Sequence, residues 1–220
     1  MNRNRSKKNK VKFNIKNVHY ALKKDDGTGY EVPVAVPGAV SVSFDAKGEL
    51  KSFYADGIAY YVTSSNGGYE GDLEMALIPD QFRLDILNEK KDQNCVMVEN
   101  VNAQTRAFAL GFDIDGDIKS TRFWFLNCTA TRPSTESSTT EDSTEPSTDK
   151  ITLTCAPNTD GNVRVKTTED TPAVTYDGWY DAVYLPVHSQ GEEVEPPAHI
   201  PEGDGGDQQE TIPEEGDLGE

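Results

Sequence analysis

The sequence predicts a mainly β protein, an antiparallel β-sandwich or barrel with one flanking α-helix. Apolar and polar residues alternate over short runs, for example Val40, Val42 and Phe44 against Ser41 and Ser43. Such alternation gives a strand one buried and one exposed face, as in an antiparallel sheet. Turn-forming residues separate most of these runs, and a single stretch has helical spacing.

The first half of the chain is rich in β-branched and aromatic residues, which suit a pleated, half-buried surface. The Asn-Gly-Gly sequence at 66–68 adopts positive φ at low cost, so the chain is expected to reverse there. After it, Leu73, Met75 and Leu77 share one face of a strand. We expect strands here at 18–22, 32–36, 39–44, 50–54, 58–63 and 71–77.

The helix is expected at 79–88. Pro79 suits its start because the missing N–H needs no partner in the first turn. Phe82 and Ile86 lie on one face, four residues apart. Further strands are expected at 95–99, 107–113, 120–131, 150–156, 163–167 and 182–185.

A group of acidic residues around Gly116 superficially resembles a calcium loop. Asp113, Asp115 and Asp117 are correctly spaced, but Ile118 and Trp124 occupy the places where an EF-hand needs Gly and Glu. A tight hairpin turn at Asp115-Gly116 explains the pattern better.

Composition and cysteine spacing fit one globular domain in a reducing compartment. The chain has 220 residues, 35% hydrophobic residues and a net charge of −17. Cys95, Cys128 and Cys155 are widely spaced and odd in number, so neither a disulfide framework nor a zinc site is predicted. Cys128 and Cys155 lie in expected strands and are interpreted as small core residues.

Charge divides the chain into three regions: a basic arm at 1–12, a β domain at 13–187 and an acidic tail at 188–220. Residues 1–16 hold seven Lys or Arg and no acid, whereas residues 191–220 hold eleven acids and no Lys or Arg. The tail has too few large apolar residues to offset its ordering entropy, so we expect it to be disordered. The arm is interpreted as a solvated or self-assembly segment, since no basic patch with interleaved aromatics predicts nucleic-acid binding.

A long polar loop at 133–149 interrupts the β pattern. It consists almost entirely of Ser, Thr, Pro and acidic residues between two good strand patterns. Loops of this length within a domain are usually functional or disordered.

The sequence predicts no catalytic residue, cofactor or metal ligand. His19, His188 and His199 are far apart, and no Ser or Cys has a recognisable nucleophile signature. The Gly-Gly pairs lack the lysine and the strand-to-helix setting of a phosphate loop. No secretory signal or membrane-length apolar run is present, so we expect synthesis in the cytoplasm and no membrane partner.

Six stretches in order give the chain a resemblance to a known family. It resembles the major tail protein, or tail tube protein, of phages with long non-contractile tails. The stretches that carry the resemblance lie at 12–22 (KFNIKNVHYAL), 34–49, 53–82 (with YYVTSSNGGYEGDLEMALIPDQF), 96–117, 125–148 and 179–186 (WYDAVYLP).

The resemblance implies two packed β-sheets with a flanking helix in a structural virion protein. Subunits would close into hexameric rings that stack into a tube, through which DNA is delivered to the host. Partners would be further copies, joined through arm 1–12 and loop 133–149, the tape measure and other tail proteins. An acidic lumen would let DNA pass without specific binding, because a surface without Lys or Arg releases no counterions.

Two alternative functions remain at the level of sequence. A β-sandwich module for cell-surface carbohydrate could use Tyr60, Tyr61, Tyr69, Trp124 and Trp179 as an aromatic platform, although strand aromatics are more often core or interface. A hydrolase on a β scaffold would need a nucleophile, base or metal group that the sequence does not present.

Overall fold

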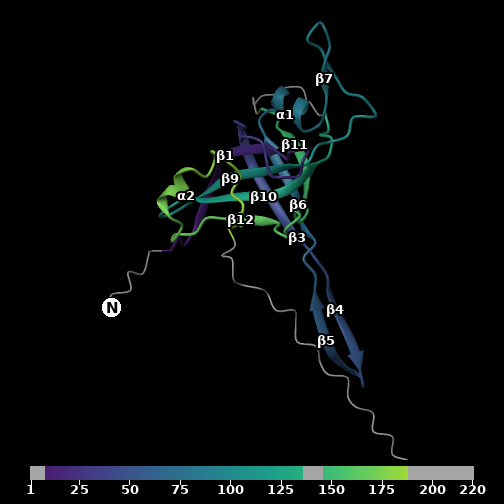
Figure 1. The fold of residues 1–220 in the computed structure, drawn as a ribbon, viewed down its shortest axis with the longest axis vertical. Coiled ribbons are helices and arrows are strands. Elements are labelled where there is room, and N and C mark those ends of the chain that lie inside the picture. The colour runs from purple at the N-terminus through teal and green to yellow at the C-terminus, as the bar shows by residue number, and fades with distance from the viewer. Residues whose placement is uncertain (1–7, 136–145, 188–220) are drawn as a thin grey trace, which may run out of the picture. The chain divides into compact units, whose positions relative to one another are not determined.

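The structure is a computed structural model that describes residues 8–135 and 146–187. The chain divides into two units, residues 1–186 and 187–220, and the helices and strands of the described residues belong to the first. Within the described residues there are twelve strands and two short helices (Figure 1), which confirms the predicted mainly antiparallel β class. The tail predicted to be disordered, 188–220, lies outside the described residues.

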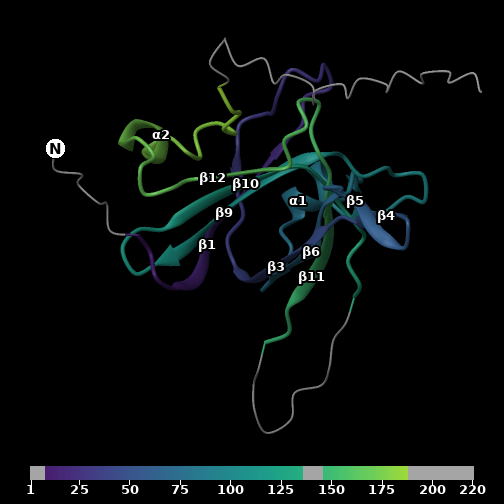
Figure 2. The same cartoon turned by 90° about the horizontal axis from the view of Figure 1, so that it is seen from below.

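The main sheet has eight strands in the order β2-β1-β9-β10-β11-β6-β3, and β12 also pairs with β10. Figure 2 shows β3, β6 and β11 side by side, next to the strands β9, β10 and β12. β1 and β3 also approach each other, so the sheet curls around the core. Its strands are β1 (Lys12–Leu22), β2 (Val34–Ala35), β3 (Ala39–Lys47), β6 (Gly68–Met75), β9 (Phe108–Gly116), β10 (Thr121–Ala130), β11 (Asp149–Cys155) and β12 (Arg164–Lys166).

Two further strand pairs stand outside the main sheet. β4 (Leu50–Ala55) pairs with β5 (Ile58–Ser64), and β7 (Lys90–Lys91) pairs with β8 (Met97–Val98). β4 follows directly on β3, and β5 leads directly into β6. The four strands therefore form one long hairpin, of which only the proximal half belongs to the main sheet.

The strand β10 changes partner and face along its length. On one side it pairs with β12 through residues 123–125 and with β11 through residues 128–130. On the other side its register with β9 shifts between Phe125 and Cys128, with Asn127 at φ 50°. This β-bulge inserts an extra residue, so that Phe125 and Cys128 both face the core although they are three residues apart.

The main core fills the inner face of the curled sheet. Helix α1 (Asp80–Asp85) covers part of it, with Phe82 edge-on to Tyr20 and to Phe108 at centroid distances of 5.3 and 5.8 Å. The Tyr20 hydroxyl donates a hydrogen bond of 2.6 Å to Asp85 on the same helix. The predicted helix is thus confirmed but is shorter than 79–88, with Pro79 as its extended N-cap residue.

The C-terminal part of the domain covers the outer face of β9 and β10. It comprises helix α2 (Ala173–Asp177) and the residues after it. Trp124, which is fully buried, donates its indole N–H to the Trp179 carbonyl at 3.1 Å. Residues 182–185 were predicted to be a strand but are irregular: Val183 and Tyr184 pack on this face, and the segment has no backbone partner strand among the described residues.

A buried ionic group fastens this segment to the sheet. Asp113 accepts hydrogen bonds from the Tyr180 hydroxyl at 2.5 Å and from Asn17 at 2.8 Å. The guanidinium of Arg122 lies 3.6 Å from the same carboxylate and stacks on the Tyr176 ring at 3.9 Å. Burial, followed by the hydrogen bond to Asp113, raises the pKa of the Tyr180 hydroxyl far above its usual range.

Two predicted turns differ from those observed. The chain does not reverse at 66–68, because β5 runs on through this segment into β6; it reverses at Asp56 and Gly57, whose φ values of 53° and 76° fit a type I′ turn. The β9–β10 hairpin exists, but its turn spans 115–120 rather than Asp115-Gly116 alone. Asn9 holds this wider turn by accepting the amide N–H groups of Ile118 and Lys119.

A methyl group added at Gly111 tests how tightly the outer face is packed. It would lie 2.7 Å from ring carbons of the buried Trp124. Gly111→Ala is therefore expected to lower the free energy of unfolding by about 2–3 kcal/mol, as overpacking does. Gly161→Ala is the matched control, because an added methyl group meets open space there. Its expected cost in the free energy of unfolding is roughly 1 kcal/mol, caused only by the positive φ of 77°. Urea unfolding of both variants compares the two costs; equal costs would contradict tight packing of Trp124 on Gly111.

Candidate self-assembly surface

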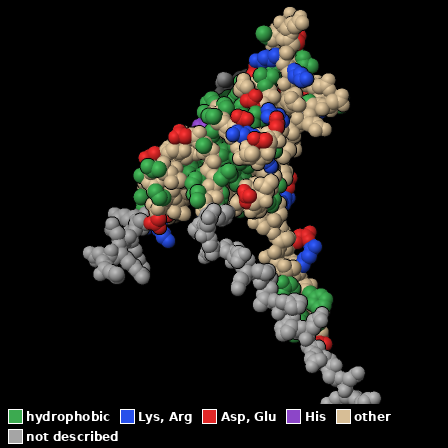
Figure 3. Space-filling view, viewed as in Figure 1, with side chains coloured by type: hydrophobic (Ala, Val, Ile, Leu, Met, Phe, Trp, Pro, Cys, Tyr) green, Lys and Arg blue, Asp and Glu red, His purple; other side chains and the backbone are tan. Residues whose placement is uncertain are grey.

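The distal half of the long hairpin, β4–β5, is the most exposed apolar element of the described structure. Every residue of β5 is exposed, and so are all of β4 except Ala55. Backbone hydrogen bonds from Gly67 to Lys47 and from Ser65 to Glu49 tie its base to β3–β6. Figure 3 shows hydrophobic side chains uncovered on this segment, in the same view as Figure 1.

The hairpin is apolar on both of its faces. Phe53 and Tyr61 are directly opposite each other on one face, and each is 63% exposed. Because side chains alternate along a strand, Leu50, Tyr54 and Val62 lie on the other face. An isolated two-stranded hairpin is marginally stable in water, and large exposed apolar patches usually mark interaction sites.

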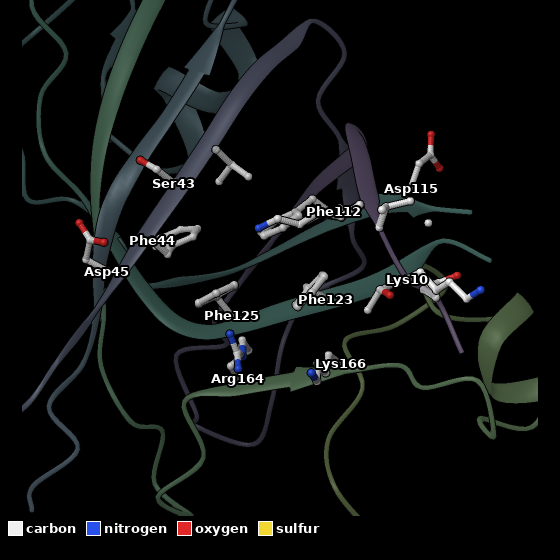
Figure 4. A pocket seen from close by; sticks show the side chains of 17 residues that line it. Lys10, Ser43, Phe44, Asp45, Phe112, Asp115, Phe123, Phe125, Arg164 and Lys166 are labelled. Atoms are coloured by element: carbon white, nitrogen blue, oxygen red, sulfur yellow. The ribbon is translucent and has the colours of Figure 1, made fainter. Parts of the chain in front are cut away.

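A groove of about 720 Å³ opens on the inner face of the sheet, between β3 and the strands β9, β10 and β12 (Figure 4). Its floor is aromatic: Phe44 stacks on Phe125 at 4.2 Å, and Phe112 stacks on Phe123 at 5.3 Å between ring centroids. The groove lies where β12, and not β11, pairs with β10. Phe44 and Phe123 are partly exposed there, whereas Phe112 and Phe125 lie beneath them in the core.

Positive charge predominates at the rim of the groove. Arg164 and Lys166 project from β12, and within the described residues neither forms a salt bridge. The Arg164 guanidinium lies 5.0 Å from the Tyr69 ring and 5.7 Å from that of Phe125, within cation–π range. Asp45 and Asp115 also line the groove, and Lys16 pairs with Asp115 at 2.5 Å and lowers its pKa.

The two predicted assembly arms are described only in part. Residues 1–7 and 136–145 lie outside the described residues. Of the arm, Asn9 is bound to the β9–β10 turn and through its amide to Glu169, and Lys10 donates its amide to Asp117. At the loop, Asp149 begins β11 and accepts the Ile78 amide at 2.9 Å.

The aromatic platform suggested for carbohydrate does not form. Trp124 of the sheet and Trp179 of the C-terminal segment are buried against each other, and Tyr69 is partly buried against the core. Only Tyr60 and Tyr61 are exposed, and both belong to the hairpin. Leu77, predicted to share the buried face of Leu73 and Met75, is 70% exposed because β6 ends at Met75.

No group of three His, Cys, Asp or Glu that could hold a metal ion occurs in residues 8–135 and 146–187. Asp113 is fully engaged with Tyr180 and Asn17, and Asp115 with Lys16 and Ser120. Neither helix of the described chain combines the length and apolar character needed to cross a membrane.

Comparison with known proteins gives structural likenesses only. No protein-family profile matches the chain, and no curated protein does. Among solved structures, a chain from the sheath–tube complex of an extracellular contractile injection system (PVC, extended state) matches with a TM-score of 0.42 and 15% identity, covering 69% of this chain and 88% of that one. A chain from the baseplate of the anti-feeding prophage matches with a TM-score of 0.43 and 9% identity, covering 73% and 96%.

The first of these assemblies is contractile, whereas the resemblance seen in the sequence is to phages with non-contractile tails. At these TM-scores and identities the matches do not establish a function.

The exposed aromatics of the hairpin should contribute little to the stability of one subunit. Replacing Phe53 and Tyr61 together by Ser is expected to change the free energy of unfolding by less than about 1 kcal/mol, since neither is buried. Phe82→Ala, which empties a fully buried site, is expected to cost about 3–5 kcal/mol. Chemical unfolding at low protein concentration measures both; a cost for the double variant close to that of Phe82→Ala would mean that the hairpin packs on its own domain.

Proposed function

We propose that this protein is a structural subunit that assembles with copies of itself into the tube of a phage-type tail. The carrying observation is the β4–β5 hairpin, which presents apolar side chains on both faces and pairs with no other described strand. Such a hairpin leaves apolar surface in water in the single subunit, and a partner that covered both faces would remove it.

A second copy of the chain fits this role better than an unrelated partner. The hairpin is aromatic and has Asp56 at its turn, and the groove has an aromatic floor with Arg164 and Lys166 at its rim. We place the hairpin of one copy in the groove of the next, with aromatic side chains on the phenylalanine floor and Asp56 near the basic rim.

This contact would join two different patches, so it is heterologous. A heterologous contact repeats from copy to copy and generates a closed ring when the rotation between subunits closes, or a helical filament when it does not. A helical filament can form a tube directly, whereas closed rings form one only when they stack through a further contact. Six subunits per ring, passage of DNA and contacts with a tape measure protein are what the sequence resemblance adds.

The proposal assigns the protein no catalytic activity and places it in the virion tail. The groove is lined by aromatic rings, amides, hydroxyls, lysines, one arginine and two aspartates, without His or Cys among the described residues. Arm 1–12 and loop 133–149 are proposed as further contacts between copies. A net charge of −17 suits a tube that does not retain DNA, since phosphate binding needs Lys and Arg.

Removing the hairpin aromatics is expected to abolish assembly. The Phe53→Ser, Tyr61→Ser double variant should remain a folded monomer, because two central apolar anchors are lost from the contact. Lys51→Ser, an exposed polar site on the same hairpin, is the control and should assemble as the parent does. Sedimentation velocity and negative-stain microscopy report the outcome. Rings or tubes from the double variant at the parent's concentration would refute the hairpin contact, and a monomeric parent that binds glycans would instead favour the carbohydrate module.

Charge reversal tests whether the groove receives the hairpin. Asp56→Lys and Arg164→Glu should each weaken assembly, by roughly 3- to 30-fold in protein concentration at the midpoint, because each places like charges together. The two substitutions combined should recover part of the loss, as a double-mutant cycle shows for residues in contact. Strictly additive losses would mean that the hairpin docks elsewhere.

A further inference from the structure

Two of the three cysteines, far apart in the sequence, face each other in the core. Cys128 on β10 and Cys155 on β11 are direct partners in the strand pairing, and both are fully buried. In the structure both are free thiols whose sulfur atoms lie 2.7 Å apart, so each thiol directly faces the other. We infer that Cys128 and Cys155 form a reversible cross-strand disulfide, independently of the function proposed above.

The register of β10 and β11 places the pair at the spacing that a disulfide needs. Ala156 donates its amide to Asn127 on one side of the pair, and Thr131 donates to Thr152 on the other. Hydrogen-bonded positions alternate along an antiparallel pair, so 128 and 155 occupy a non-hydrogen-bonded site between them. At such sites the Cα atoms are about 4.5 Å apart, within the range that disulfides span.

The β-bulge at 126–127 makes this meeting possible. Without the extra residue, Cys128 would share the outward face of Trp124 and Leu126 instead of the inner face with Cys155. Cys95 lies outside this arrangement, since it is exposed.

The reaction is thiol–disulfide exchange with a small disulfide such as oxidised glutathione. One cysteine thiolate attacks the small disulfide and releases one glutathione, leaving a mixed disulfide; the second cysteine displaces the other glutathione. The two protein thiols lose two protons and two electrons, which convert one oxidised glutathione to two reduced ones.

Burial of the two thiols limits when the exchange reaction can occur. The Cys128 thiol donates a weak hydrogen bond to the Phe125 carbonyl at 3.4 Å, and burial raises its pKa, so thiolate is scarce in the folded domain. The bridge therefore forms as β11 docks on β10 or when that edge opens. A cytosolic redox poise keeps the pair reduced, and an oxidising medium closes it.

The bridge would tie both ends of the Ser/Thr-rich loop 133–149 to the centre of the sheet. β10 ends shortly before this loop and β11 begins at its end. A disulfide that closes the segment from Cys128 to Cys155 in the unfolded chain is expected to lower the unfolding equilibrium constant by about 30- to 700-fold.

Refolding the full chain in glutathione buffers tests the inference. After acid quenching, alkylation under denaturing conditions and peptide mapping, the oxidised sample should contain a Cys128–Cys155 linked peptide, and so should Cys95→Ser. Oxidised protein should unfold at higher urea concentration than the same protein after dithiothreitol. Cys128→Ala and Cys155→Ala should show no such difference between buffers.

The wild-type comparison needs no substitution, so it stands even where an alanine variant fails to fold. Full alkylation of both cysteines after oxidising refolding, or a linkage that runs through Cys95, would overturn the inference.

Discussion

One edge of β10 pairs with two different strands, and this divided pairing determines much of the remaining structure. β12 takes the first half of the edge and β11 the second, on either side of the bulge at 126–127. The groove with its phenylalanine floor lies along the first half of this edge, beside β12. The bulge turns the second half of β10 over, which brings Cys128 into the core opposite Cys155.

The long hairpin separates the apolar surface used for folding from the surface available for association. In its proximal half, Leu73 and Met75 on β6 are fully buried, and Asp72 and Glu74 point outward to Lys150 and Thr148 of the β11 side. In its distal half, no apolar residue is buried. Burying a large apolar side chain gains about 1.5–3 kcal/mol, so covering several such side chains on β4–β5 would favour the proposed association.

β9 shows why a covered sheet differs from an exposed one. Phe108, Leu110 and Phe112 face the core as their alternation predicts, yet Ala109 and Gly111 on the opposite face are buried too. The C-terminal segment covers them, held by Trp179, by Tyr180 on Asp113 and by Arg122 against Tyr176. A buried carboxylate is tolerated here because hydrogen bonds and a cation compensate its lost hydration.

The sequence by itself determined most of the strands, helix α1 and the antiparallel class, because these depend on local periodicity and propensity. The alternation at Phe108–Phe112 and the apolar spacing of Phe82 and Ile86 sufficed for that. The sequence did not indicate helix α2, and it wrongly indicated a strand at 182–185. Local signals did not predict the observed reversal at Asp56-Gly57. The stronger turn signal, Asn-Gly-Gly at 66–68, lies instead within a continuous arm of the hairpin. Only the tertiary structure decided that Trp124 and Trp179 are buried, that Tyr61 is exposed, and that Cys128 meets Cys155. Each of these depends on which distant segment covers a face or shifts a register by one residue, and strand periodicity carries no information about that partner.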